Sequence, residues 1–216
     1  MTLGLRGVRS RRMRVRRVEV VTVLGGAALL TSSWVVVAIE KRVPGWESDV
    51  FRDVNDLTGS LWPVVRWPMQ VGSLPGSLAV VAITWVVSRK RRLAVAALLA
   101  TQAAYWGAKA VKVAVSRARP FVLLQGVHVR ERASGLGYIS GHTAVAFALA
   151  AVLAPSLPRA WRPVAFAVAL LVAFARVYSG AHLPLDTVGG AGLGLLCGTL
   201  ARWALGLGGE GLPARA

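Results

Sequence analysis

Residues Val20–Ile39 have the sequence VVTVLGGAALLTSSWVVVAI, which is 20 residues without a charged side chain. A helix needs about 20 apolar residues to cross the hydrocarbon core of a bilayer. The segment lacks the polar face that a surface helix of a soluble protein carries. It therefore predicts a transmembrane helix near the N-terminus, which is also compatible with an uncleaved signal anchor.

Five further apolar stretches have similar lengths and carry charges, if any, mainly near their ends. They are Trp67–Ser88, Leu93–Ser116, Gly141–Pro158, Arg159–Tyr178 and Leu183–Leu207. The sequence thus predicts an all-α, polytopic membrane protein with six transmembrane helices in a bundle. We expect a basic tail at 1–19, one six-helix membrane domain at 20–207 and a short C-terminal tail at 208–216.

The net charge of +17 does not indicate a nucleic-acid partner, because Lys and Arg fall in clumps between long uncharged runs. The densest clumps are Arg6–Arg17 and Arg89–Arg92. By the positive-inside rule these segments and both termini are cytoplasmic. The basic N-terminal tail sets this topology or binds anionic lipid headgroups.

In this topology, ionisable residues gather at the extracytoplasmic ends of the last four predicted helices. They are Lys112, Arg119, His142, Arg176, His182 and Asp186. Ionisable groups at membrane depth are costly and are usually paired or functional. We therefore expect one active site at the extracytoplasmic face.

The local sequence around these residues suits a phosphate. Lys112 and Arg119 share a helix face if the helix continues to Pro120. Ser140–His142 precedes an apolar run, and Pro184 suits a first helical turn, so each marks a helix N-terminus that favours an anion.

The histidines add chemistry to this binding site. Asp186 lies four residues after His182 and can hold that imidazole in one tautomer as a nucleophile or base. His142 can then protonate a leaving oxygen. The sequence shows no metal-ligand pattern, so we expect no metal and no cofactor.

These residues resemble the three motifs of the type 2 phosphatidic acid phosphatase (PAP2) superfamily of membrane lipid phosphatases. The matching positions are Lys112 with Arg119-Pro120, Ile139-Ser140-Gly141-His142, and Ala175-Arg176 with His182 and Asp186. Two positions depart from the motifs, because Ile139 replaces a proline and Ala175 replaces a serine. Neither change removes a charged or proton-transferring group, so the site is expected to function.

The resemblance implies a metal-independent phosphoryl transfer in two steps, within a membrane phosphatase domain at 20–207. His182 attacks phosphorus to form a phosphohistidine, Asp186 orients His182, and His142 protonates the leaving group and then activates water. The implied phosphate-binding residues are Lys112, Arg119, Ser140, Gly141 and Arg176.

The resemblance also implies a lipid phosphate as substrate, at the bacterial plasma membrane. An extracytoplasmic site best fits a polyprenyl carrier such as undecaprenyl diphosphate. Phosphatidylglycerol phosphate, phosphatidic acid and a decaprenyl-phosphosugar remain alternatives, as does a lipid phosphotransferase on the same scaffold. A binding protein or transporter would have little use for the two histidines, and the vanadate haloperoxidases of the wider superfamily are soluble. The oligomeric state is left open.

Two other patterns concern packing. Gly190, Gly194 and Gly198 form a small-residue stripe that allows another helix to approach closely. The segment Glu40–Arg66 mixes acidic and aromatic residues, which suits either an interfacial helix near the substrate entrance or a solvated loop.

Overall fold

The computed structural model describes residues 2–40 and 42–208, with side chains from residue 17 onward, and these residues form helices and no strand. The predicted C-terminal tail lies outside the described residues except for Gly208. In chain order the helices are α1 (Thr2–Ile39), α2 (Gly45–Asn55), η1 (Gly59–Leu61), α3 (Trp62–Met69), η2 (Gln70–Gly72), α4 (Leu74–Ser88), α5 (Arg91–Val115), α6 (Pro120–Leu123), α7 (Gly141–Leu153), η3 (Ala154–Ser156), η4 (Arg159–Trp161), α8 (Arg162–Tyr178) and α9 (Pro184–Ala204).

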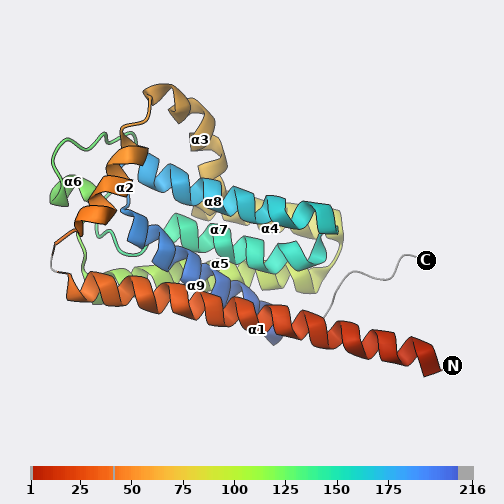
Figure 1. Cartoon of the computed structure of the whole chain (residues 1–216). Helices are drawn as coiled ribbons and strands as arrows, with labels where there is room; N and C mark the ends of the chain where they lie inside the picture. The colour runs from red at the N-terminus through yellow and green to blue at the C-terminus, as the bar shows by residue number, and fades with distance from the viewer. Residues whose placement is uncertain (1, 41, 209–216) are drawn as a thin grey trace.

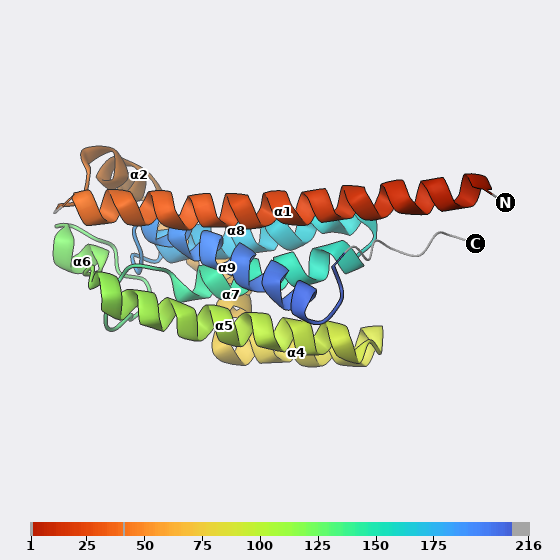
Figure 2. The ribbon, with the colours of Figure 1, turned by 90° about the horizontal axis from the view of Figure 1, so that it is seen from below.

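The long helices run along one another as a bundle, with α1 extending past its end (Figure 1). The short helices α2 and α6 lie at one end of the bundle. The N-terminal end of α1 and the C-terminal end of α9 lie toward the other end. Figure 2 shows α7 and α9 between α1 on one side and α4 and α5 on the other. The predicted basic tail at 1–19 is largely a continuation of α1, which begins at Thr2.

The helix α7 forms the centre of the core, because ten of its 13 residues are buried. It packs against α9 along the glycine stripe. A Cβ atom built on Gly190, Gly194 or Gly198 would lie 2.5, 2.3 or 2.6 Å from a backbone oxygen of this neighbouring segment. The predicted role of the stripe in helix packing is therefore confirmed. On another face of α9, Gly192 meets Gly26 of α1 in the same way.

Each of the six predicted membrane segments contains a helix, but the prediction of one continuous helix over Trp67–Ser88 is wrong. The chain bends by 67° between the segment that ends at Gly72 and α4. Ser73 is extended, with φ −77° and ψ 160°, and its Oγ accepts a hydrogen bond from the Gly76 N–H at 3.1 Å. A new N-cap therefore starts a new helix within the apolar run.

By length and composition alone, two of the described helical stretches can cross a membrane, Arg17–Ile39 and Arg159–Tyr178. The bent pair Gly59–Gly72 and Leu74–Ser88 makes a third if it is counted as one span. The helix α7 has only 13 residues. The count of six spans therefore stays a prediction.

The expectation that Lys112 and Arg119 share one helix face is wrong. Helix α5 ends at Val115, and Ser116 has a left-handed backbone with φ 53°. Arg119 then lies in extended conformation just before Pro120, as residues that precede proline prefer. The two side chains reach the same site from a helix and from a loop.

The segment Glu40–Arg66 contains helices, so the alternative of a solvated loop is wrong. Helix α2 is amphipathic, with Glu47 and Phe51 buried one turn apart. Trp46 on the same helix is 54% exposed. This helix lies at the end of the bundle away from the start of α1 (Figure 1).

The close contact of α7 with α9 predicts the effect of adding a side chain there. We expect Gly194→Leu to destabilise the protein by about 1–3 kcal/mol or more, because its Cβ would meet a backbone oxygen of α7 at 2.3 Å. Gly25→Leu in α1 is the matched control, since nothing lies within 4 Å of its Cβ position. Thermal unfolding in detergent measures both, and an unchanged midpoint for Gly194→Leu would contradict the close packing.

Candidate active site

One cavity of about 510 Å³ gathers most of the predicted site residues from five places along the chain. It is lined by Lys112 at the end of α5, Arg119 in the following loop, Gly141 and His142 at the start of α7, Arg176 in the last turn of α8 and His182 in the loop between α8 and α9. Asp186 lies behind His182 and is fully buried. Ser140 is also buried and does not line the cavity.

The buried imidazole of His182 lies between a carboxylate and a guanidinium. Its Nδ1 is 3.4 Å from Oδ2 of Asp186, and that oxygen also accepts the Leu183 N–H at 2.9 Å. Its Nε2 is 3.5 Å from Nη1 of Arg119. These contacts suit the tautomer with the proton on Nδ1. In that tautomer the Nδ1–H of His182 faces the carboxylate of Asp186, and its Nε2 faces an N–H of Arg119. Nε2 is left with a lone pair on the side of the cations.

Backbone carbonyl groups fix two of the positively charged side chains of the cavity, Lys112 and Arg119. Nζ of Lys112 donates to the carbonyl oxygens of Leu136 and Gly137 at 2.7 and 2.8 Å. Arg119 donates to the carbonyl of Ala181 at 2.8 Å and to two carbonyls of the loop before α7 at 2.7–3.1 Å. Carbonyl oxygens orient these side chains and leave their positive charges without a carboxylate partner in these contacts.

Arg176 differs, because its Nη1 pairs with the carboxylate of Glu131 in the loop between α6 and α7. The same Nη1 also lies 3.5 Å from the sulfur of Met69. Within the described residues its buried Nε has no hydrogen-bond partner. Glu131 lines the cavity as well. Sequence reasoning missed this residue, since nothing in its local sequence marks it.

The N-terminus of α7 presents its backbone to the cavity. Oγ of Ser140 accepts from Oγ1 of Thr143 at 3.0 Å and from its N–H at 3.5 Å, so Ser140 is the N-cap of the helix. Gly141 and His142, the first two residues of the helix, line the cavity. The first backbone N–H groups of a helix have no partner within the helix.

Close backbone contacts hold His142 in place. A Cβ atom on Gly72 would lie 2.4 Å from the backbone oxygen of His142, so η2 approaches α7 too closely for any side chain at this position. The N–H of Ser140 donates to the carbonyl oxygen of Asp186 at 2.8 Å. The start of α7 is therefore tied directly to the start of α9.

The two departures from the family motifs are both buried apolar residues that do not line the cavity. Ile139 and Ala175 are fully buried. The peptide bond between Tyr138 and Ile139 is cis. Ala175 packs with Met69 and Tyr178. At both positions the substituted side chain belongs to the hydrophobic core.

Sequence reasoning also missed two charged residues that support Asp186, namely Arg117 and Glu47. Arg117 pairs with both carboxylates. A signal for it exists, since it lies between Lys112 and Arg119 of the first motif. A signal for Glu47 is its position one helical turn before Phe51, on the apolar face of α2.

The described residues contain no group of three or more His, Cys, Asp or Glu side chains arranged to hold a metal ion. The positive charge in the cavity comes instead from Lys and Arg side chains. They can neutralise a phosphoryl group directly.

A family model described as the PAP2 superfamily matches residues 93–207, more than half of the chain. The chain belongs to the PAP2 superfamily. The family recognised from three motifs is therefore confirmed, and with it the enzyme class of a lipid phosphatase. The matched range begins in α5 and ends just after α9, so it contains all the predicted site residues.

Two solved structures share this fold. The crystal structure of Aquifex aeolicus LpxE has a TM-score of 0.70 and 23% identity, covering 76% of this chain and 98% of that one. A transmembrane PAP2-type phosphatidylglycerolphosphate phosphatase from Bacillus subtilis has a TM-score of 0.70 and 20% identity, covering 83% of this chain and 94% of that one. A comparison with curated proteins finds no match. The all-α membrane architecture of the PAP2 protein is confirmed.

The surroundings of His182 predict its protonation state. Its pKa lies well below the ordinary value of 6.5, because the ring is buried and because Arg176, Lys112 and Arg119 add positive charge. A base with a lowered pKa stays neutral as the pH falls through that ordinary value. We therefore expect the ¹⁵N NMR signals of His182 to remain those of a neutral ring with a protonated Nδ1 at pH 6.5 and just below. His182→Gln assigns the signals, and protonation at or above pH 6.5 would contradict this environment.

Proposed function

We propose that the protein removes phosphate from a membrane lipid phosphate or diphosphate without a metal, through a phosphohistidine on His182. The observation that carries this proposal is Arg176, whose Nε is buried with no hydrogen-bond partner in the described part of the chain. Arg176 lines the same cavity as His182 and His142. A phosphate oxygen would supply the acceptor that this buried donor needs.

In the first step Nε2 of His182 attacks phosphorus, and the bond from phosphorus to the lipid oxygen breaks. His142 gives its proton to that oxygen, so the lipid leaves as a neutral alcohol or, from a diphosphate, as a monophosphate. Asp186 accepts the hydrogen bond from Nδ1 and stabilises the positive imidazole that results.

In the second step His142, now neutral, takes a proton from water while the water oxygen attacks phosphorus. The bond from phosphorus to Nε2 of His182 breaks, and inorganic phosphate leaves. His142 ends the cycle protonated and His182 ends it neutral, so both groups are ready for another turnover.

The charge of the transferring group is neutralised by Lys112, Arg119 and Arg176. The backbone N–H groups of Gly141 and His142 add the partial positive charge of a helix N-terminus. We assign Ser140 to the α7 cap rather than to a phosphate contact, since its Oγ is engaged by Thr143.

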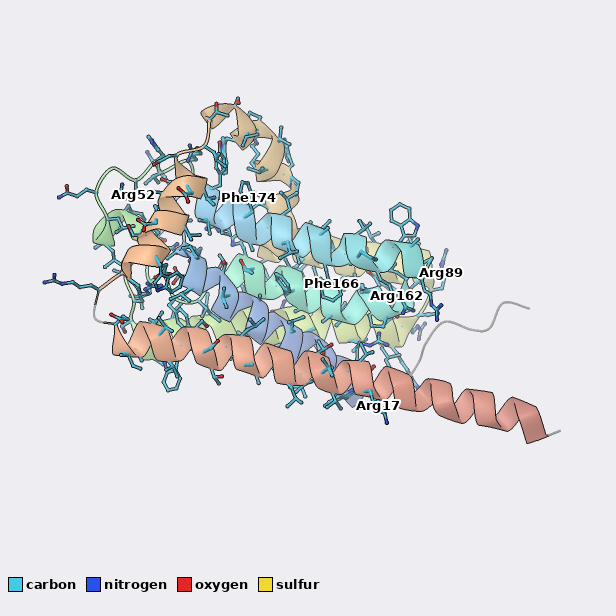
Figure 3. All side chains as sticks on the ribbon, in the orientation of Figure 1. Arg17, Arg52, Arg89, Arg162, Phe166 and Phe174 are labelled. Carbon is cyan, nitrogen blue, oxygen red and sulfur yellow. The ribbon has the colours of Figure 1, made fainter. Side chains whose placement is uncertain are left out.

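The basic residues support an extracytoplasmic site in a bacterial plasma membrane. Figure 3 labels Arg17, Arg89 and Arg162 at the end of the bundle opposite to Arg52. With the first three on the cytoplasmic side, the cavity faces outward.

Exposed apolar side chains near the same end favour a lipid over a soluble ester. Trp46 in α2 is 54% exposed, and Trp67 in α3 is 66% exposed. Amphipathic aromatic side chains are favoured at membrane interfaces. A substrate that enters from the membrane would meet this surface before the cavity.

Two further cations at the cavity favour a diphosphate over a monophosphate. Lys109 and Arg132 line the cavity, are exposed and lie outside the family motifs. Nζ of Lys109 lies 4.7 Å from the ring centroids of both Tyr105 and Trp106, so two aromatic faces hold the ammonium at the rim. A polyprenyl diphosphate such as undecaprenyl diphosphate carries a second phosphate that can use these charges.

The test is phosphate release by protein purified in detergent, with excess EDTA. The substrates are undecaprenyl diphosphate, phosphatidylglycerol phosphate, phosphatidic acid, a decaprenyl-phosphosugar and a soluble aryl phosphate. We expect release that survives EDTA, is fastest with the diphosphate and falls at least about 1000-fold in His182→Gln, because the nucleophile is lost.

The matched control is His128→Gln, which changes an exposed histidine outside the cavity and should keep the wild-type rate. Release that EDTA abolishes would contradict a metal-independent reaction. Phosphate transfer to a second lipid in place of release would identify a phosphotransferase on the same scaffold.

The role of the rim cations is tested separately. We expect Lys109→Gln to raise KM for the diphosphate about tenfold, equivalent to about 1.4 kcal/mol, and to change KM for a monophosphate less than about threefold. Arg66→Gln is the matched control, because Arg66 stacks on Trp67 at 4.8 Å and does not line the cavity. Equal effects on both substrates would contradict a second phosphate position at Lys109.

A further inference from the structure

Arg117 joins two buried carboxylates beneath the cavity. Its Nη1 donates to Oδ1 of Asp186 at 2.9 Å and to Oε1 of Glu47 at 3.1 Å. Its Nη2 donates to Oε2 of Glu47 at 2.5 Å. Both carboxylates are fully buried, and the Arg117 side chain is 10% exposed. The guanidinium therefore forms a bidentate ion pair with Glu47 through two nitrogens and a single hydrogen bond with Asp186 through one.

Glu47 makes a second contact that fixes it to the same place. Its Oε1 accepts the backbone N–H of Leu185 at 2.9 Å, in the first turn of α9. A residue of α2 thus reaches the helix turn that carries Asp186. The carboxylate of Asp186 is held on one side by Arg117 and on the other by the Leu183 N–H and His182.

We propose that Arg117, held by Glu47, is a positioning residue for the nucleophile, because it fixes Asp186 with one oxygen turned to Nδ1 of His182. This inference rests on the roles that the proposed function gives to His182 and Asp186. Neither Arg117 nor Glu47 lines the cavity, so both act through Asp186 and not on the substrate.

The charges around Asp186 explain why it needs a fixed partner. Lys112, Arg119 and Arg176 gather on the cavity side of His182, and a carboxylate that could turn would be drawn toward them. Arg117 holds Oδ1 away from these cations, while Glu47 balances the charge of Arg117. The two carboxylates raise the pKa of Arg117 above its ordinary value, against the lowering effect of its burial.

A purely structural role for the pair predicts something else. Arg117 and Glu47 would then only anchor α2, and their loss would lower stability without a specific effect on chemistry. Asn55 gives a matched comparison, because it anchors the other end of α2 through hydrogen bonds from its Nδ2 to the carbonyl oxygens of Tyr178 and His128, both at 3.0 Å. None of these hydrogen bonds, nor the one that its Oδ1 accepts from the His128 N–H, involves Asp186.

The experiment uses the full chain in detergent and the double variant Arg117→Gln/Glu47→Gln. Removing both charges together avoids leaving Glu47 as a buried carboxylate without its partner, as Arg117→Gln alone would do, while Asp186 loses Arg117 in either variant. We expect kcat to fall about 10- to 100-fold with KM within about threefold, as for other residues that orient a reacting group through a hydrogen bond. Arg117→Lys keeps the positive charge but lacks the two guanidinium nitrogens that bind both carboxylates. Its kcat should therefore lie between that of the wild type and that of the double variant.

The second readout is the ¹⁵N NMR spectrum of the three histidines, which needs no turnover. In the double variant we expect His182 to change from a single tautomer with Nδ1 protonated to a mixture of two. Asn55→Ala should lower the unfolding temperature, keep kcat within about threefold and leave the His182 signals unchanged.

A folded double variant with unchanged kcat and an unchanged His182 tautomer would overturn the inference. So would an equal loss of kcat in Asn55→Ala, since the pair would then act only by anchoring α2. The NMR readout separates this inference from the proposed function, because it reports the tautomer of His182 without turnover. It would still test the role of Arg117 if the protein hydrolysed none of the lipids.

Discussion

The close contact between α7 and α9 determines where the reactive groups lie. The two histidines come from the starts of these helices, His142 from the first turn of α7 and His182 from two residues before α9. The glycines of α9 allow the helices to touch through backbone atoms, and the hydrogen bond from Ser140 to Asp186 joins their first turns. A larger spacing would separate the two histidines. The packing of small residues deep in the bundle is therefore a condition for chemistry at its end.

The second condition is that several cations stay together in a buried place. Their mutual repulsion is opposed by fixed acceptors: carbonyl groups for Lys112 and Arg119, and the carboxylate of Glu131 for Arg176. Because these acceptors belong to the fold, the cations are oriented before a phosphate arrives, and little reorganisation is needed. Glu131 differs from the carbonyls in that its negative charge competes with a phosphate for Arg176.

The sequence predicts the fold and the site where a short pattern determines a contact. The glycine stripe of α9, the cap at Ser140 and the spacing of His182 to Asp186 are local, and the structure contains each of them. Apolar length likewise predicts the six long helices. It misses the break at Ser73, because one N-cap within an apolar run leaves the mean composition almost unchanged.

Long-range pairs are the part that one sequence does not reveal. Glu47 and Arg117 are 70 residues apart, and Glu131 and Arg176 are 45 apart. Nothing local distinguishes Glu131 from a solvent-exposed acid, and the position of Glu47 on the apolar face of α2 suggests burial without naming its partner. The arrangement of Lys112 and Arg119 fails for a related reason, because whether a helix continues to Pro120 depends on the left-handed turn at Ser116. Tertiary packing decides both cases.

Trapping the covalent intermediate tests the central claim most directly. We would mix His142→Gln with an aryl phosphate in EDTA, since an aryl leaving group needs no proton, and then locate the phosphate by mass spectrometry after a neutral quench. A phosphohistidine at His182 that accumulates because its hydrolysis lacks a base is the predicted result. Phosphate on another residue, or turnover with no phosphoenzyme at any time, would contradict nucleophilic attack by His182.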